Sequence, residues 1–204
     1  MSKRVSSWFR KDRMEGLTDG IFATVMTILV LSLVVPTVTG PNASATLQAD
    51  VYGLIPDLFA YIITFIFLGV LWISHQNIFS HIENIDLKTT WINLLLLLSV
   101  GLAPFSTALL GRYPLQQIAV IAYGINAVAV SVLFNVLWFY PRVRHLTHEE
   151  PNPEIIAKRS RIVLIGPTIY ILAIAFSFLT TEISLGLFVF VTVFYIIFGG
   201  RYFH

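Results

Sequence analysis

Two hydroxyl side chains, Thr24 and Thr27, stand on the first apolar stretch of this 204-residue chain. In a helix they share one stripe with Ile28 and Leu31, because residues three, four and seven positions apart lie on the same face. Hydroxyl oxygens can replace part of the water shell of an ion, and rings of aliphatic side chains can close a narrow path by excluding water. The stripe therefore predicts an ion path with a hydroxyl level and an apolar level. The alternative is that both threonines bond carbonyls of their own helix and pack against neighbours.

Polar residues also gather near the start of this stretch. Thr18 and Asp19 are expected in the inner third of the first membrane helix, close to Arg13, and His75 and Asn93 at the same depth of the next two helices. An unpaired carboxylate at that depth is costly, so we predict a polar network that holds the first helix against its neighbours. Two simpler interpretations stay open, namely that Thr18 or Asp19 caps the helix and that His75 bonds a single carbonyl.

The sequence offers no catalytic or fixed metal site. The chain contains no Cys, which excludes thiolate ligands and Cys nucleophiles. His75 and His81 are six residues apart and so do not share a helix face. The HExxH and GxSxG motifs and paired aspartates are absent. We therefore predict no enzymatic activity, no cofactor and no fixed structural metal.

The elements that position these residues follow from the composition. The chain is 56% hydrophobic and only 12% charged, against about 25% charged residues in an ordinary soluble domain. Long runs without Asp, Glu, Lys or Arg can each hold a helix of about 17–25 residues, enough to cross a bilayer. Period-two alternation, which a barrel would show, is not seen, and helices are the remaining way to satisfy the backbone in lipid. The sequence therefore predicts one all-α, multi-pass membrane domain over 1–204, with six transmembrane helices near 16–35, 55–79, 89–111, 116–140, 161–180 and 183–200.

Lys and Arg residues predict the orientation. With six spans, the segments 1–15, 80–88, 141–160 and the C-terminus lie on one side. Of the 13 Lys and Arg residues, 11 fall in these segments, Arg161 stands at the edge of the fifth span on the same side, and Arg112 lies on the other side. By the positive-inside rule both termini are expected in the cytoplasm. Residues 36–54 are then an outer loop, rich in turn-forming residues. The small basic excess is accounted for by this topology, so no nucleic-acid partner is expected.

Several motifs resemble those of one family. Arg13-x-x-x-Leu17-Thr18-Asp19-Gly20 resembles the Arg-x-x-x-Phe-Ser-Asp signature that opens the first helix of the transmembrane protein 175 family, potassium channels of bacteria and of the lysosome. The second and third spans carry further likenesses, in Trp72-x-x-His75-x-x-x-Phe79, Trp91-x-Asn93-Leu94 and Ala103-Pro104-Phe105-Ser106-Thr107. The resemblance covers roughly residues 13–111 by motif, and beyond that it rests on span count and length.

The resemblance implies more than the residues show. It implies six-helix subunits that assemble as tetramers around a pore lined by the first helix, with potassium near Thr24 and Thr27. The family usually has a bulky aliphatic residue where this chain has Thr24, so the apolar constriction is expected at Ile28 or Leu31. The signature and polar-network residues that it implies are Arg13, Leu17, Thr18, Asp19, His75, Trp91 and Asn93.

Together with the residues of the first span, this resemblance implies a potassium-permeable cation channel that conducts passively. We expect a homotetramer in the lipid bilayer of a bacterial inner membrane, because one subunit supplies a single pore helix and no internal duplication supplies another. A secondary transporter and a non-transporting membrane scaffold remain as alternatives. A carrier usually shows inverted repeats or helices broken at corresponding positions, and the sequence shows neither, although Pro104 and Pro167 are candidate kinks. A scaffold would show no change of flux when the first span is altered.

Overall fold

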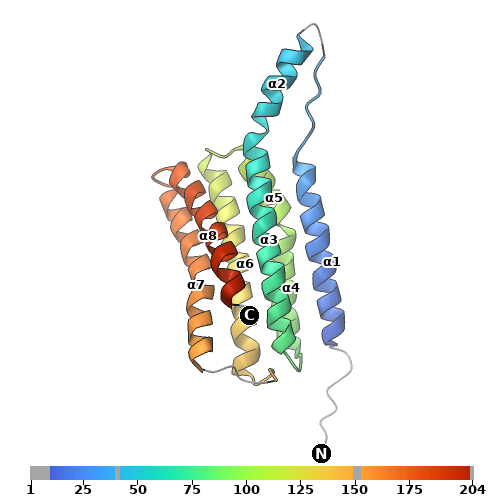
Figure 1. Ribbon diagram of the computed structural model, residues 1–204, viewed down its shortest axis with the longest axis vertical. Helices are drawn as coiled ribbons and strands as arrows, with labels where there is room; N and C mark the ends of the chain where they lie inside the picture. The colour runs from blue at the N-terminus through green and yellow to red at the C-terminus, as the bar shows by residue number, and fades with distance from the viewer. Residues whose placement is uncertain (1–9, 40–41, 149–152, 203–204) are drawn as a thin grey trace, which may run out of the picture.

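The computed structural model describes residues 10–39, 42–148 and 153–202, with side chains in the last range described for 160–197 only. The described residues form a bundle of helices, and the only β-type pairing among them is one isolated bridge between Ile82 and Thr147. The elements are α1 (Lys11–Leu29), the 3₁₀ turn η1 (Val30–Ser32), α2 (Ala43–Gly53), α3 (Ile55–His81), α4 (Leu87–Gly101), α5 (Ala103–Arg112), α6 (Gln117–Val143), α7 (Pro153–Phe176) and α8 (Thr181–Tyr202) (Figure 1). The predicted all-α class is confirmed.

Several helices of the bundle are long and apolar enough to cross a membrane. Four helical stretches in the described residues meet that condition, namely Lys11–Ser32, Ala43–His81, Leu87–Arg112 and Gln117–Val143. The described apolar parts of the last two helices, Ser160–Phe176 and Thr181–Ile197, are shorter. The first helix begins at Lys11 rather than near residue 16, because its first turns can extend into water with their charged side chains. Its α-helical part ends at Leu29.

The third predicted span, 89–111, is divided by a kink. Pro104 has no N–H to donate, so the helix is interrupted at Leu102 between α4 and α5. The Nδ2 atom of Asn126, on α6, donates to the Ser99 carbonyl at 2.9 Å. In a membrane such a side-chain bond is needed because lipid cannot satisfy backbone groups at a kink.

The segment 36–54, expected as a turn-rich loop, contains a helix. The turn-forming residues stand before position 42, and the stretch Ala43–Gly53 has neither Gly nor Pro until its last residue, so a helix can form there. None of the side chains of α2 is buried, and together with residues 33–39 the helix projects beyond the rest of the bundle (Figure 1).

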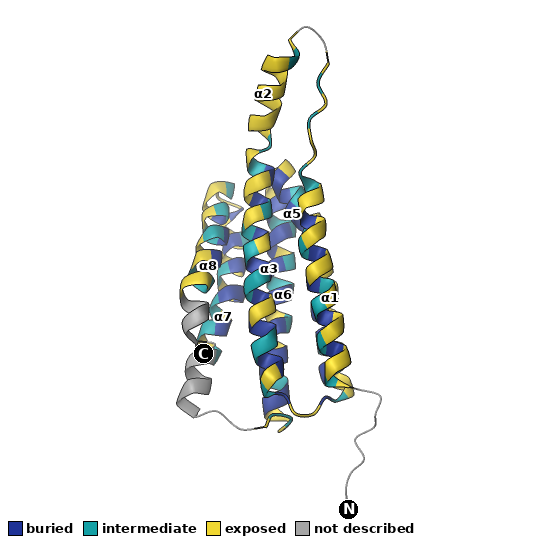
Figure 2. Ribbon diagram, turned by 45° about the vertical axis from the view of Figure 1, so that its right-hand side comes forward, coloured by how far each residue is buried: buried dark blue, intermediate teal, exposed yellow. Residues whose placement is uncertain are grey.

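Helix α1 lies at one edge of the bundle and packs on α3, α4 and α5 (Figure 1). Its buried residues recur every three or four positions and so form a single stripe: Met14, Thr18, Phe22, Val25 and Leu29. Figure 2 shows this stripe turned toward the bundle while the rest of α1 is exposed or half-buried. The helix is therefore held by one face only.

Candidate ion-conduction site

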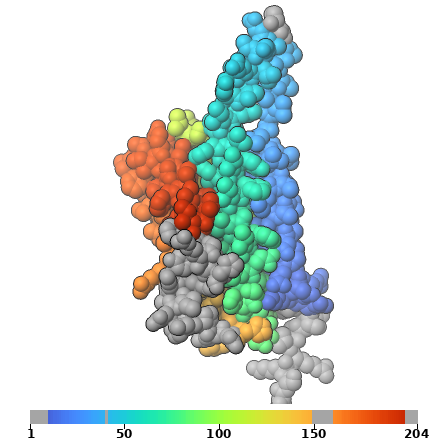
Figure 3. Space-filling model, viewed as in Figure 1, coloured from blue at the N-terminus to red at the C-terminus, as the bar shows by residue number. Residues whose placement is uncertain are grey.

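The face of α1 opposite its buried stripe carries the residues that the sequence assigned to an ion path. Thr24 and Thr27 are exposed, and the exposed fraction is 43% for Ile28 and 72% for Leu31. Gly20 lies one turn before Thr24 on the same face and is exposed too. The space-filling view shows α1 along the margin of the molecule, with no other helix on its outer side (Figure 3). The described part of one subunit therefore leaves this face without a partner.

Both hydroxyl groups donate to their own helix. Thr24 Oγ1 donates to the Gly20 carbonyl and Thr27 Oγ1 to the Thr24 carbonyl, each at 2.7 Å. The structure thus contains the bonds to backbone carbonyls that the alternative interpretation of the two threonines expects. Their side chains are nevertheless exposed and do not pack against neighbouring helices. Because each hydroxyl proton is used on the backbone, the lone pairs of the oxygen remain to accept from water or to contact a cation.

Leu31 belongs to a different kind of turn from the threonines. It lies in η1, where the helix tightens to a 3₁₀ turn. A 3₁₀ turn rises about 2.0 Å per residue against about 1.5 Å in an α-helix. The apolar level at Leu31 therefore stands slightly further along the axis than a continuous α-helix would place it.

Thr18 joins α1 to α4 and, through it, to α3. Its hydroxyl oxygen accepts from Asn93 Nδ2 at 3.1 Å, and Asn93 Oδ1 lies 2.9 Å from His75 Nε2. An amide oxygen can only accept, so His75 donates from Nε2 when the amide has this orientation. Thr18 and Asn93 are fully buried, and the His75 ring stacks on Phe79 with centroids 4.2 Å apart. This chain of bonds fixes α1 against both neighbours inside the bundle.

Asp19 makes a second, separate attachment to α3. Its Oδ1 atom accepts from Trp72 Nε1 at 2.9 Å and from Gln76 Nε2 at 2.8 Å. The helix begins about two turns before Thr18 and Asp19, so neither residue caps it. Sequence reasoning did not assign Gln76 to the network. The available signal was its spacing, since a residue four positions after Trp72 presents its side chain to the same neighbour.

Three of the residues named with the network stand outside it. Leu17 and Trp91 are 46% and 58% exposed. Arg13 is exposed, and within the described residues it makes no hydrogen bond or ion pair with Asp19. The geometry therefore brings together Thr18, Asp19, His75 and Asn93, but not Arg13, Leu17 or Trp91.

The described residues form a helical membrane bundle whose first helix is held by polar contacts and has an exposed face with hydroxyl groups. This arrangement fits an ion-conducting protein, and similarities to known proteins point to the same class. Residues 13–104 match the family described as endosomal/lysosomal potassium channel TMEM175. A potassium channel of Chamaesiphon minutus is 33% identical, over 85% of this chain and 87% of that protein. A potassium channel of Streptomyces collinus is 30% identical, over 85% of each.

The fold points the same way. The crystal structure of a lysosomal potassium-selective channel TMEM175 homologue from Chamaesiphon minutus superposes with a TM-score of 0.81 at 27% identity, covering 92% of this chain and 96% of that one. The chain therefore belongs to the TMEM175 family. This is a family of ion channels and not of enzymes, and the predictions of family and class are confirmed.

Proposed function

We propose that this protein is a potassium-permeable channel that conducts passively through a pore lined by α1 in a cyclic homotetramer. The observation that carries the proposal is the free face of α1, which presents Thr24 and Thr27 on the side opposite to its packed stripe. The relatives named potassium channels, which align with most of this chain, support the choice of ion.

An oligomer follows from the number of pore helices. Within the described residues one subunit contributes a single helix with such a face, and a ring of copies around an axis closes the path by symmetry. Gly20 and Ala23 leave little bulk on or beside that face, and small residues let helices approach closely in a membrane.

The levels of the proposed pore differ in chemistry. At Thr24 and Thr27 the hydroxyl oxygens of the copies would replace part of the water around potassium. About 10 Å along the helix axis from Thr24, Leu31 would narrow the path, and Ile28 stands between Thr27 and Leu31. A ring of aliphatic side chains opposes ion passage because it excludes water, so this level would act as the constriction.

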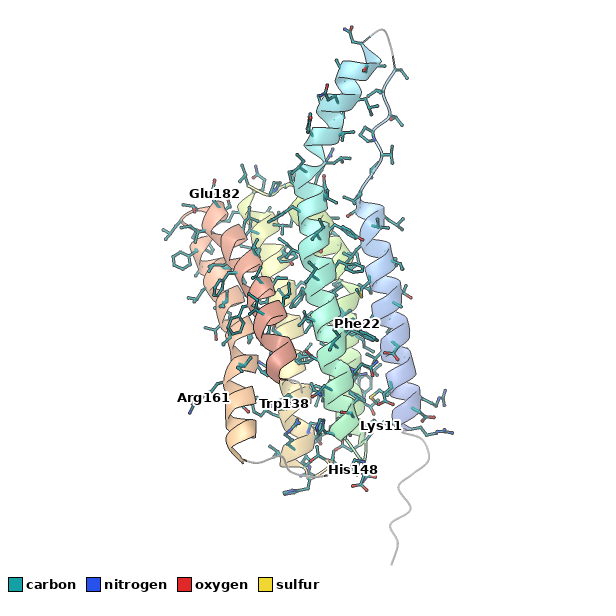
Figure 4. The ribbon with its side chains drawn as sticks, in the orientation of Figure 1. Lys11, Phe22, Trp138, His148, Arg161 and Glu182 are labelled. Carbon is teal, nitrogen blue, oxygen red and sulfur yellow. The ribbon has the colours of Figure 1, made fainter. Side chains whose placement is uncertain are left out.

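The orientation rests on the positive-inside rule. Lys11, His148 and Arg161 lie toward one end of the bundle and Glu182 at the other (Figure 4). The basic end is proposed to face the cytoplasm of a bacterial cell, with the protein in the inner membrane. Conduction would then run from the first turns of α1 inside to η1 outside.

A flux assay in liposomes tests the proposal. The wild-type protein is expected to pass potassium down its gradient without saturation, and faster than sodium. Leu31→Ala should widen the constriction and so lower the free-energy barrier to ion passage. A barrier lower by about 1.4 kcal/mol raises a rate tenfold, and the flux should rise by about that factor. Leu164→Ala, which shortens an equally aliphatic exposed side chain on α7, is the matched control and should change nothing.

Four results would contradict the proposal. Absence of flux would favour a scaffold, and flux that ignores Leu31→Ala would contradict a pore lined by α1. Saturable, substrate-specific uptake would favour a secondary transporter. A mass in detergent other than that of four subunits would contradict the tetramer separately.

A further inference from the structure

A cavity of about 810 Å³ lies at the end of the bundle from which α2 projects. Its walls come from the segment after η1, from α2, from the first turn of α3 and from α5. Pockets that bury small molecules are typically about 300–1,000 Å³ in volume. No residue of α1 lines the cavity, and it shares no lining residue with the face proposed for conduction.

A buried carboxylate lines this cavity, and the positive charge nearest to it is that of Arg112 on the same cavity. Asp57 is only 8% exposed, and among the described residues it makes no hydrogen bond or ion pair. It stands in the first turn of α3, but no side-chain bond caps that helix. The charge of Arg112 offsets only part of the cost of burying this carboxylate, so the placement of Asp57 favours a ligand that brings a cationic group to it.

The neighbouring helix is shaped around this carboxylate. A Cβ atom at Gly111 would lie 2.7 Å from Asp57 Oδ1 and 2.8 Å from the Asp57 Cα atom. Both distances are too short for any side chain, and the second involves backbone that cannot turn aside. Glycine at position 111 therefore makes the room in which Asp57 sits.

The other residues that line the cavity indicate what the rest of the ligand should be. The titratable groups on the cavity are Asp50, Asp57, Arg112 and Tyr113, which leaves one net negative charge at neutral pH. Val34 and Val35, which are 69% and 79% exposed, stand on the same cavity with Leu54 and Phe105. Such apolar walls suit an alkyl chain and do not suit a hydrated inorganic ion.

We propose that this cavity binds the primary ammonium group of an amphiphile, with the ammonium on Asp57 and the alkyl chain against the valines. An ammonium has three donors and can be satisfied by one carboxylate and a few neutral acceptors. Calcium needs six to eight oxygen ligands, and no group of three or more His, Asp or Glu in the described residues could hold a metal ion. The ligand is a free alkylamine or the ethanolamine headgroup of a phospholipid, whose phosphate would meet Arg112.

The test is a thermal-unfolding series on the purified full-length protein in detergent, and it does not depend on conduction. Octylammonium should raise the melting temperature by about 2–4 °C, because a ligand that binds only the folded state stabilises it. Octyltrimethylammonium, which has no N–H donor, and octanol, which has no charge, should shift it by less than a third as much. Equal shifts from all three compounds would overturn the proposal even without a variant.

Two variants locate the site. Asp57→Asn keeps the shape but removes the charge, and it should abolish the difference between octylammonium and octanol. Glu182→Gln, which neutralises a carboxylate in the first turn of another helix, is the matched control and should keep it. A retained difference in Asp57→Asn would place the ammonium elsewhere and overturn the proposal.

A last comparison separates the two sources of the ammonium. A shift with dihexanoyl phosphatidylethanolamine that exceeds the shift with dihexanoyl phosphatidylcholine would support the site and identify the lipid headgroup. A shift with octylammonium and with neither lipid would support the site with a free amine as its ligand.

Discussion

Two outer surfaces of the bundle, that of α1 and that of the α7–α8 pair, are exposed to a similar extent but differ in chemistry. The free face of α1 offers two hydroxyl groups on neighbouring turns beside Gly20. The exposed residues of α7 after Arg161 are alkyl or aromatic apart from Thr168, and those of α8 from Ile183 to Ile197 are apolar. The α7–α8 surface suits lipid tails, whereas the α1 face has a composition suited to contact with water and ions.

The polar groups of α7 and α8 are used inside the pair. Pro167 interrupts the backbone bonding of α7, and the Tyr195 hydroxyl on α8 repairs it. That hydroxyl accepts from the Gly166 N–H at 2.9 Å and donates to the Ile162 carbonyl at 3.1 Å. A Cβ at Gly166 would lie 2.8 Å from the hydroxyl oxygen, so a larger residue there would displace the bridging hydroxyl. Exposure alone therefore does not distinguish the face proposed for conduction, whereas two hydroxyl groups on neighbouring turns do.

The largest effect on stability is expected from removing the side chain that links α1 to both α3 and α4 through hydrogen bonds. Asn93→Ala would leave both Thr18 and His75 without their shared partner in the fully buried network. The free energy of unfolding should fall by about 2–4 kcal/mol, and assembled oligomer should be lost with it. Thermal unfolding and a mass measurement in detergent check this. An oligomer with unchanged stability and conductance would show that the network does not hold α1.

A matched pair of hydroxyl deletions tests the comparison directly. Thr27 and Thr168 are both exposed, and both donate to carbonyls of their own helices, at 2.7 and 2.9 Å. Thr27→Val should lower potassium flux in liposomes about tenfold, because it removes an oxygen level from the proposed pore. Thr168→Val should leave flux unchanged. Equal effects of the two substitutions, or none, would remove the distinction between the two surfaces.

The sequence predicts some of these features and not others, for physical reasons. Helix class follows from long uncharged runs, and the link between Thr18, Asn93 and His75 follows from the cost of isolated polar groups at depth. Gln76 escaped notice because its partner, Asp19, is distant in sequence and only the packing of α1 on α3 brings them together. The helix Ala43–Gly53 is not predicted, because the turn-forming residues just before it indicate a loop for the whole segment 36–54.

A smaller effect on stability is expected from removing the side-chain hydroxyl that bridges two backbone groups of α7. Tyr195→Phe keeps the ring but removes the hydroxyl that bridges Gly166 and Ile162, so two backbone groups near the Pro167 kink lose their partner. The free energy of unfolding should fall by about 1–2 kcal/mol, as measured by thermal or denaturant unfolding. The ratio of potassium to sodium flux should stay the same, since α7 and α8 are proposed to face lipid. A changed ratio would mean that this pair contributes to the path.

The smallest effect is a dependence of stability on pH, and it should arise on the α1 side of the bundle. Burial raises the pKa of the Asp86 carboxyl, but the hydrogen bonds it accepts from Tyr140 and Thr89 outweigh burial and hold the pKa below its ordinary value. The bonds are 2.6 Å from the Tyr140 hydroxyl and 2.7 Å from both the N–H and the hydroxyl of Thr89, so Asp86 ties α4 to α6. Lys11, at the start of α1, donates to the Ile82 carbonyl in the same loop.

The sign of the pH effect follows from the lowered pKa. A carboxylate whose pKa is lower in the folded state contributes its stability above the unfolded value, about 4, and loses it as the pH falls further. Between pH 6 and pH 3 the melting temperature of the wild-type protein should therefore fall by about 2–4 °C more than that of Asp86→Asn. Tyr195→Phe should fall as much as the wild type, because the bridge on α7 does not titrate in this range. Parallel curves for wild type and Asp86→Asn would show that this carboxylate does not couple pH to the α1 side.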